Sequence, residues 1–293
     1  MNESLAIGNW TLLSTTYLDS CIQYIIDYLK DAVEHLILFF IAYITLCIAL
    51  YLSAVHWKHI GGCNLAPKRV LFVVAHPDDE CMFFGPTIIK HTSRHDCQVY
   101  LLCLSKGNSD GLGSIRTKEL WKSGAKLQIP DENIILINNT LLQDNPKVSW
   151  REDVIARIIL THIEELRIDT LITFDRHGVS RHKNHCSIFY AVAFLCLDSK
   201  IPSYCTVYTL ESTNILRKYW LLLDIPLSYL LSSYRYILNW KERCQIIDAM
   251  RQHKSQLVWF RRLYLLVSRY TMINTLNQMN TIDLELDLEI DPD

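Results

Sequence analysis

The sequence lacks any Cys-x-x-Cys pair, although its 10 cysteines are spread from Cys21 to Cys244. Several of them lie inside apolar runs, where a free thiol packs as a small hydrophobic side chain. This distribution favours a reduced, cytosol-facing compartment over a disulfide framework.

The chain also lacks a large excess of charge of one sign, since its formal net charge is −2. The last segment, 281–293, carries six acidic residues and no Lys or Arg, which leaves 29 basic against 25 acidic residues in the rest. Such a small excess does not indicate nucleic-acid binding, and we expect no nucleic-acid partner.

Formal charge is absent from the twenty residues Leu36–Val55. As a helix this run would be roughly 30 Å long, the thickness of the hydrocarbon core of a bilayer. We predict a single transmembrane anchor at 36–55, and a buried helix of a soluble protein is the alternative. A cleaved signal peptide is disfavoured because the run is too long and too far from the start.

Charges on either side of this run predict its orientation. Residues 1–35 are acidic, whereas Lys58, Lys68 and Arg69 follow the run with no acidic residue before Asp78. The positive-inside rule therefore places the short N-terminus in the lumen and the main part of the chain in the cytoplasm. The predicted parts are a lumenal segment 1–35, the anchor 36–55, a linker 56–67, a catalytic domain 68–280 and an acidic tail 281–293.

Strand-like and helix-like segments alternate from Lys68 onward. Strands are predicted at Val70–Ala75, Gln98–Leu104, Ile134–Ile137, Thr170–Phe174 and Cys205–Leu210. Helices are predicted at Met82–His91, Ser114–Leu127, Arg151–Leu166 and Asn184–Leu197. This alternation predicts an α/β fold with a Rossmann-like, mainly parallel sheet flanked by helices.

The C-terminal third has a weaker pattern. Asp224 and Pro226 interrupt the apolar stretch within Ile215–Leu238, which makes a second membrane span unconvincing. Trp259–Tyr264 mixes aromatic and basic residues in a predicted helix, which suits a face on anionic lipid headgroups and equally an amphipathic core helix with a solvated basic side. For Ile282–Ile290 an edge strand is an alternative to the expected disordered end.

Two polar clusters follow predicted strands. His76-Pro77-Asp78-Asp79-Glu80 comes after the first strand, and 175–185 comes after the fourth. Loops after parallel strands open on the same edge of a sheet, so His76, Asp79, His182 and His185 can converge.

Two imidazoles, one carboxylate and an open position are the usual composition of a catalytic zinc site. His182 and His185 are three residues apart and share a helix face, although His-x-x-His alone more often marks two unrelated polar helix residues. Nucleotide binding is disfavoured because 70–80 lacks a glycine-rich turn that would hold phosphate.

The two clusters together resemble those of the LmbE-type zinc deacetylases, which remove acetyl groups from N-acetylglucosamine conjugates. The anchor and four further strings resemble the eukaryotic branch, which acts on N-acetylglucosaminyl-phosphatidylinositol, and the resemblance covers roughly residues 36–275. The four strings are Leu104–Asn108, Ile115–Leu120, Leu216–Tyr219 and Ser255–Tyr264.

This resemblance implies that His76, Asp79 and His185 hold a divalent metal, with Zn²⁺ expected. It implies that Asp78 is the general base and that His182 is the acid or oxyanion stabiliser. It also implies a glycolipid substrate and a location in the endoplasmic reticulum membrane, with the catalytic domain on the cytoplasmic side. A deacetylase of a soluble N-acetylglucosamine conjugate and a non-catalytic membrane-anchored binding protein are the alternatives.

Four further residues are candidates for substrate binding or for support of the site. Glu80 is expected to be a structural carboxylate, and Asp175 is expected to orient a histidine through its free ring nitrogen. Asn108 and Arg116 are placed to contact the sugar or phosphate, and a surface salt bridge is the alternative for Arg116. The chain departs from the family at Arg181, where Gly is common.

Overall fold

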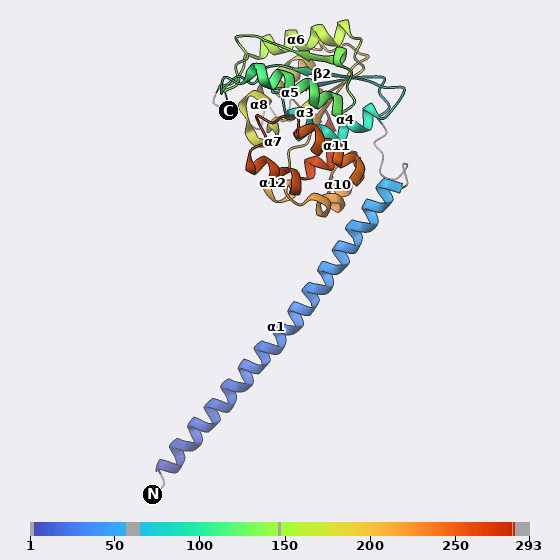
Figure 1. Cartoon of the computed structure of the whole chain (residues 1–293). Helices are drawn as coiled ribbons and strands as arrows, with labels where there is room; N and C mark the ends of the chain where they lie inside the picture. Colours follow the sequence, from blue (N-terminus) through green and yellow to red (C-terminus); the bar gives the residue numbers. More distant parts are fainter. Residues whose placement is uncertain (1–2, 57–64, 146–147, 283, 285–293) are drawn as a thin grey trace. The chain divides into compact units, whose positions relative to one another are not determined.

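The computed structural model describes residues 3–56, 65–145, 148–282 and 284 of the chain (Figure 1). These residues form two compact units, 1–49 and 50–293, and each is described by itself.

The first unit consists of most of helix α1 (Glu3–His56). Residues 17–56 contain neither Gly nor Pro, so nothing in this stretch interrupts the helical hydrogen bonding. By length and composition, Tyr17–His56 is able to cross a membrane. The predicted anchor lies inside this helix, which begins well before Leu36 because the preceding residues are helical too.

The second unit is built on a seven-stranded sheet with the order β3-β2-β1-β4-β5-β7-β6. The first five strands are parallel, and β1 lies between β2 and β4 with Val70 opposite Val99 and Thr170. Strands β7 and β6 are antiparallel to their neighbours. The strands are β1 (Arg69–Val74), β2 (Gln98–Cys103), β3 (Ile134–Leu136), β4 (Thr170–Phe174), β5 (Thr206–Leu210), β6 (Tyr234–Ile237) and β7 (Ile273–Gln278).

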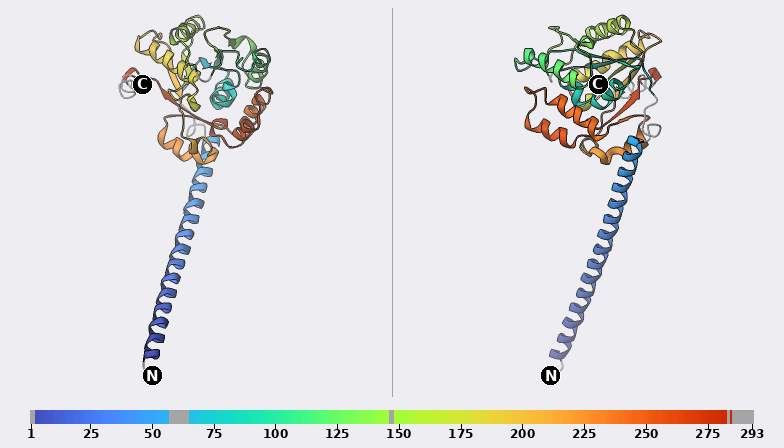
Figure 2. Two further views of the ribbon diagram at one scale, coloured as in Figure 1. Left: turned by 90° about the vertical axis from the view of Figure 1, so that its left-hand side faces the viewer. Right: turned by 45° about the vertical axis from the view of Figure 1, so that its right-hand side comes forward.

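Helices form two layers on this sheet (Figure 2). One layer pairs α6 (Glu152–Glu165) with α8 (Lys183–Leu197), and the other pairs α11 (Trp240–Met250) with α4 (Gly85–Thr92) and α5 (Gly113–Lys126). Strands β1 and β4 are buried between these layers, as expected of parallel strands covered on both faces. Shorter helices complete the fold: α3 (Asp79–Met82), η1 (Asp131–Asn133), α7 (Gly178–Arg181), α9 (Ile215–Lys218), η2 (Leu221–Asp224), α10 (Ile225–Leu231), α12 (Trp259–Val267) and η3 (Arg269–Thr271).

The predicted α/β fold with a mainly parallel sheet is confirmed, and all five predicted strands are present within one residue. The single helix predicted over Met82–His91 is wrong, because α3 ends at Met82 and α4 begins at Gly85. Pro86 explains the break, since proline is suited to the first turn of a new helix but not to the interior of a continuous one.

Strands β6 and β7 were not predicted. Strand β7 contains Asn274 and Thr275, which are both almost completely buried. These polar residues interrupt the apolar pattern by which a buried strand is predicted from sequence. Asn274 donates to the carbonyl oxygen of Phe83 at 2.8 Å, so its polarity is satisfied by a contact distant in sequence. Most of the predicted linker 56–67 and of the predicted tail 281–293 lies outside the described residues.

The C-terminal elements are joined by a buried ion pair. Nε of Arg269 lies 2.9 Å from Asp224 Oδ2, and both side chains are fully buried. Arg269 also donates to Ser228 Oγ at 2.9 Å, and Arg217 donates to the other carboxylate oxygen of Asp224 at 2.6 Å. The pair therefore links η2 and α10 to η3 and the start of β7.

We predict that Arg269→Met lowers the stability of the chain by about 3–5 kcal/mol, because it leaves Asp224 buried with one cation fewer. Arg251→Met is the control, since Arg251 forms an exposed ion pair with Asp248 and such pairs contribute little. Thermal unfolding of the purified full chain in detergent measures both effects. Equal midpoints for the two variants would contradict this role of the buried pair.

Candidate functional site

The loop between β1 and α3 supplies the first half of the site. His76, Asp78 and Asp79 are almost completely buried at the carboxyl end of β1. Asp79 Oδ2 accepts hydrogen bonds from the backbone N–H groups of Ala75 at 3.0 Å and His76 at 2.9 Å. The chain itself thus fixes the Asp79 carboxylate beside His76.

The segment after β4 supplies the second half. His185 Nδ1 lies 3.0 Å from the carbonyl oxygen of Gly178, and its ring stacks on Phe174 with 4.1 Å between centroids. Gly178 has a φ of +52°, and a Cβ there would lie 2.6 Å from that of His185. Glycine is therefore required where this loop passes the histidine.

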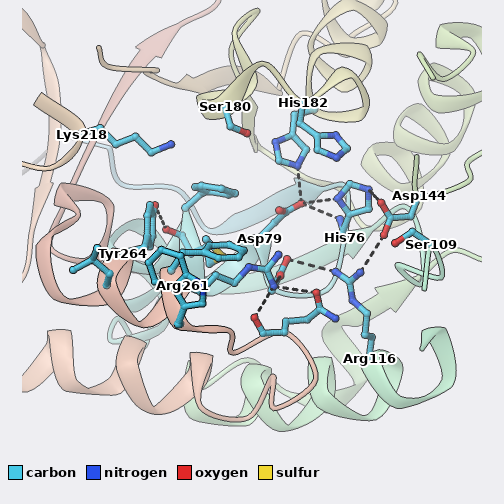
Figure 3. A pocket seen from close by; sticks show the side chains of 18 of the residues that line it. His76, Asp79, Ser109, Arg116, Asp144, Ser180, His182, Lys218, Arg261 and Tyr264 are labelled. Carbon is cyan, nitrogen blue, oxygen red and sulfur yellow. Dashed lines mark hydrogen bonds and ion pairs between the residues drawn. The ribbon is translucent and has the colours of Figure 1, made fainter. Parts of the chain in front are cut away.

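These two loops meet, as predicted, although their residues are far apart in sequence. His185 Nε2 lies 3.3 Å from Asp79 Oδ2, and potential ligand atoms of His76, Asp79 and His185 all lie within 4.8 Å of one another (Figure 3). The Nε2 atom of His185 is buried and has no hydrogen-bond partner in the part of the chain that the structure describes. A buried nitrogen that faces a carboxylate and a second imidazole without a hydrogen bond to either fits a divalent metal ion.

The protonation states of His76 and Asp79 agree with this fit. Burial lowers the pKa of His76 well below its ordinary value, which keeps the ring in the neutral form that binds metals. Burial opposes the ionisation of Asp79, but the neighbouring His185 and His76 outweigh it and hold the pKa of Asp79 below its usual range. The carboxylate is therefore ionised, as a metal ligand must be. Burial disfavours the protonated form of His185, but the Asp79 carboxylate outweighs it and raises the pKa of His185, so a metal bound there would displace a proton.

Asp78 adopts a different geometry from its neighbour Asp79. Its φ of +117° is unusual for a residue with a side chain. Its N–H donates to Glu80 Oε2 at 2.9 Å, and Arg116 Nη2 donates to the carbonyl oxygen of Pro77 at 2.8 Å. These contacts hold a strained turn that separates the two carboxylates.

Two arginines flank the Asp78 carboxylate. Arg116 Nη2 lies 3.7 Å from Oδ1, and Arg261 Nη1 lies 2.6 Å from Oδ2 as an ion pair without hydrogen-bond geometry. Burial raises the pKa of Asp78 even though both guanidinium groups oppose that rise. A carboxylate with a raised pKa is a stronger base than an ordinary aspartate.

His182 is half-buried at the start of α8. Its Nδ1 accepts a hydrogen bond from the backbone N–H of Asn184 at 3.3 Å, so the proton of the neutral ring is on Nε2. Burial, assisted by the nearby His185, lowers the pKa of His182. The ring is therefore a neutral donor through Nε2 at pH 7.

Glu80 belongs to a buried polar cluster next to Asp78. It is fully buried, and its Oε1 accepts from Ser123 Oγ at 2.5 Å and lies 2.6 Å from His253 Nε2. Because Glu80 also binds the N–H of Asp78, this cluster supports the strained turn from behind. Sequence analysis missed His253, which comes from beyond the end of α11 and belongs to no recognisable motif.

Arg116 is buried, so the alternative of a surface salt bridge is wrong. It donates to the carbonyl oxygen of Gly107 and to Asp144 Oδ2, both at 3.0 Å. Asp144 Oδ1 in turn lies 3.2 Å from His76 Nε2. Asp144 was also missed, although its place after β3 on the same sheet edge was a usable signal. Asn108 is exposed, and its Oδ1 accepts from the N–H of Gly113 at 2.8 Å.

Asp175 was expected to contact a histidine ring, but it binds Gly178 and Ser212 instead. Asp175 Oδ1 accepts from the N–H of Gly178 at 3.0 Å, and both carboxylate oxygens accept from Ser212 at 2.6 Å. The partner of His185 Nδ1 is instead the carbonyl oxygen of Gly178. Asp175 therefore acts on the histidine through the loop that it stabilises.

The three candidate metal ligands border a pocket of about 650 Å³, together with Asp78, Arg116, Asp144 and His182. Its inner wall carries His76, Asp78, Asp79, Asp144 and His185. Its outer wall comes from α9 and α12 and includes Lys218, Trp259, Phe260, Arg261 and Tyr264. The pocket therefore has a polar, titratable inner end and an aromatic and basic mouth (Figure 3).

The amino-acid sequence of the chain is similar to those of known proteins. A sequence model of the PIG-L family, described as GlcNAc-PI de-N-acetylase, matches residues 71–196. N-acetylglucosaminyl-phosphatidylinositol de-N-acetylase from Bos taurus is 48% identical over 211 residues, which are 72% of this chain and 83% of the relative. A probable enzyme of the same name from Schizosaccharomyces pombe is 41% identical over 78% of this chain and 93% of its own.

Among solved structures, N,N'-diacetylchitobiose deacetylase from Pyrococcus horikoshii has the same fold. The TM-score is 0.55 at 16% identity, over 74% of this chain and 85% of the archaeal one. That likeness concerns the fold alone, whereas the sequence identities extend over most of this chain and of its relatives. The chain belongs to the PIG-L family of N-acetylglucosaminyl-phosphatidylinositol de-N-acetylases.

Proposed function

We propose that this chain hydrolyses the N-acetyl group of N-acetylglucosaminyl-phosphatidylinositol. The products are glucosaminyl-phosphatidylinositol and acetate, and the reaction is the second step of GPI-anchor biosynthesis. The observation that carries the proposal is the convergence of Asp78, His182 and the set His76, Asp79 and His185 in one pocket. The chain's membership of the family and the names of its relatives support the substrate.

The proposed roles follow from the positions of the side chains. When bound by His76, Asp79 and His185, a divalent metal supplies Lewis acidity toward water and the amide carbonyl. Asp78, with its raised pKa, accepts the proton of the attacking water. His182 Nε2–H stabilises the developing negative charge on the carbonyl oxygen, and the proton that Asp78 has taken from the water is available to the departing amine.

Zn²⁺ is the metal we propose for this site. Two imidazole nitrogens and one carboxylate oxygen form a common catalytic zinc set, which leaves room for water and substrate. Asn184 Nδ2 lies 3.3 Å from His76 Nε2, and Asp144 lies on the same side of that ring. These neighbours orient the imidazole, as the surroundings of metal-bound histidines commonly do.

Lys218 supports a substrate that contains a phosphodiester. It extends from α9 toward the pocket, with Nζ 5.8 Å from the centre of the Tyr264 ring and 6.0 Å from that of Tyr219 (Figure 3). Among the described residues, no carboxylate forms an ion pair with it. Half-burial lowers the pKa of Lys218, and an anionic phosphodiester beside it would favour the charged form.

We further propose that α1 anchors the enzyme in the endoplasmic reticulum membrane with the catalytic unit on the cytoplasmic side. The length and apolar composition of α1 support an anchor. The basic residues Lys58, Lys68 and Arg69 after the apolar run, and the acidic residues before it, support this orientation.

Metal removal tests the proposed chemistry. We expect dialysis against a chelator to abolish acetate release from N-acetylglucosaminyl-phosphatidylinositol, and one equivalent of Zn²⁺ to restore it. His185→Ala should remain inactive after zinc is added, whereas His95→Ala, a change at an exposed histidine, should behave like the unmodified chain. Full activity of the chelated enzyme, shown metal-free by elemental analysis, would contradict the proposal.

A second test concerns Lys218 and the phosphodiester. We expect Lys218→Met to raise KM for the glycolipid by about 10-fold or more, since a charge-assisted contact contributes roughly 1.5–3 kcal/mol. With N-acetylglucosaminyl-inositol, which lacks the phosphate, the change in KM should be small. Lys254→Met is the control at an exposed lysine. An equal rise in KM for both substrates would exclude a phosphate contact.

A further inference from the structure

Large apolar side chains are exposed around the mouth of the pocket. On α12 the exposed fractions are 76% for Trp259, 54% for Phe260, 52% for Leu263 and 65% for Leu266. On α9 they are 73% for Ile215 and 63% for Leu216. We call these six residues the apolar rim. Single exposed apolar residues need no explanation, but a cluster around a pocket indicates an interaction surface.

The exposure does not result from a loosely held helix. The opposite side of α12 is anchored, because Tyr264 and Leu265 are buried and the Tyr264 hydroxyl donates to the carbonyl oxygen of Met82 at 2.9 Å. Trp259, Leu263 and Leu266 have the spacing of one helical face. The structure therefore holds this apolar face rigidly outward.

Both rim segments flank the same pocket. Tyr219, which follows α9, and Tyr264 of α12 are in ring contact with 6.4 Å between their centroids. Lys218 from α9 and Trp259, Phe260 and Leu263 from α12 line the cavity. A molecule bound to the rim would therefore lie at the opening through which a substrate enters.

The charge of the rim segments favours an anionic surface. Residues 215–220 and 259–267 contain four basic and no acidic residues. Arg217 pairs with Asp224, and Arg261 pairs with Asp78, which leaves Lys218 at the pocket and exposed Arg262 beside the rim. Aromatic and aliphatic side chains with adjacent basic ones are typical of helices that lie in a lipid headgroup layer.

The packing of the end of α1 provides a second reason to expect a bilayer next to the rim. Tyr51, which belongs to the second unit, packs with Ile225 and Met272 in one apolar cluster together with Leu221 and Leu222 of η2. Segment η2 begins directly after Trp220, at the end of the α9 region. The end of α1 that belongs to the second unit therefore packs against η2, which follows the segment with two of the six rim residues. Helices α10 and α12 lie on the same side of that unit (Figure 1).

We infer that the apolar rim inserts into the headgroup layer of a bilayer that contains anionic phospholipids. The pocket then opens onto the membrane surface, and the sugar of a glycolipid enters while its acyl chains stay in the bilayer. This inference rests on the proposed glycolipid substrate for its purpose, but the contact with lipid is a separate physical claim. It makes α1 a tether and the rim the element that orients the site.

Fluorescence quenching tests the contact without reference to activity. The full chain is reconstituted into nanodiscs of phosphatidylcholine and phosphatidylserine in which the phosphatidylcholine acyl chains are brominated. We expect Trp259→Phe to remove a measurable part of the lipid-dependent quenching, and Trp121→Phe on α5 to remove none. Equal quenching of the unmodified chain and of Trp259→Phe would overturn the inference.

A kinetic experiment tests whether the rim promotes hydrolysis of membrane-bound substrate. It changes only rim residues that do not line the pocket. The variant Ile215→Ser/Leu216→Ser/Leu266→Ser should lose about 10-fold in kcat/KM for glycolipid in phosphatidylserine-containing bilayers. With N-acetylglucosaminyl-inositol, which carries no lipid, it should match the unmodified chain. The control is Tyr190→Ser/Phe194→Ser/Tyr204→Ser, which changes exposed aromatic residues on and after α8.

The outcomes separate the two proposals. No acetate release by the unmodified chain would refute the proposed function, while the quenching result would still decide the lipid contact. Full activity of the rim variant on bilayer substrate would overturn the inference and leave the deacetylase intact. If the rim variant instead changed only the oligomeric state, the rim would be a contact between two copies of the chain, and the inference would be wrong.

Discussion

The site depends on the position of one carboxylate, that of Asp79. It is fixed by the backbone N–H groups at the end of β1 and faces His185 from the segment after β4. Without the negative charge of Asp79, two buried imidazoles would meet with nothing between them to compensate their desolvation. The parallel pairing of β1 with β4 brings the loops that follow them together, and the charge of Asp79 makes the close contact between their histidines favourable.

A second constraint separates Asp79 from the adjacent Asp78. Because Asp78 has a positive φ, its side chain takes a different direction and meets Arg116 and Arg261 instead of the histidines. The buried Glu80 and His253 maintain that conformation. Strain of this kind persists only where surrounding contacts over-determine it, and here it gives two neighbouring aspartates opposite shifts in pKa.

The central part of this arrangement was predictable from the sequence. A buried strand followed by His76–Glu80, and another followed by 175–185, suffice to place His76, Asp79 and His185 together, because parallel strands end on one edge. His253 and Arg261 were not predictable. Each reaches the site through a tertiary contact, from a loop or a helix with no pattern of its own, and only the packed structure shows which polar residue meets which.

The account assigns different tasks to two adjacent, chemically equal residues, and the most direct measurement compares them. Zinc content and acetate release from N-acetylglucosaminyl-phosphatidylinositol are measured on purified Asp78→Asn and Asp79→Asn. We expect Asp78→Asn to retain one zinc per chain while its rate falls by about 10²–10⁴-fold, as for the loss of a general base. Asp79→Asn should lose the metal itself. Loss of zinc from Asp78→Asn, or full activity in either variant, would contradict the account.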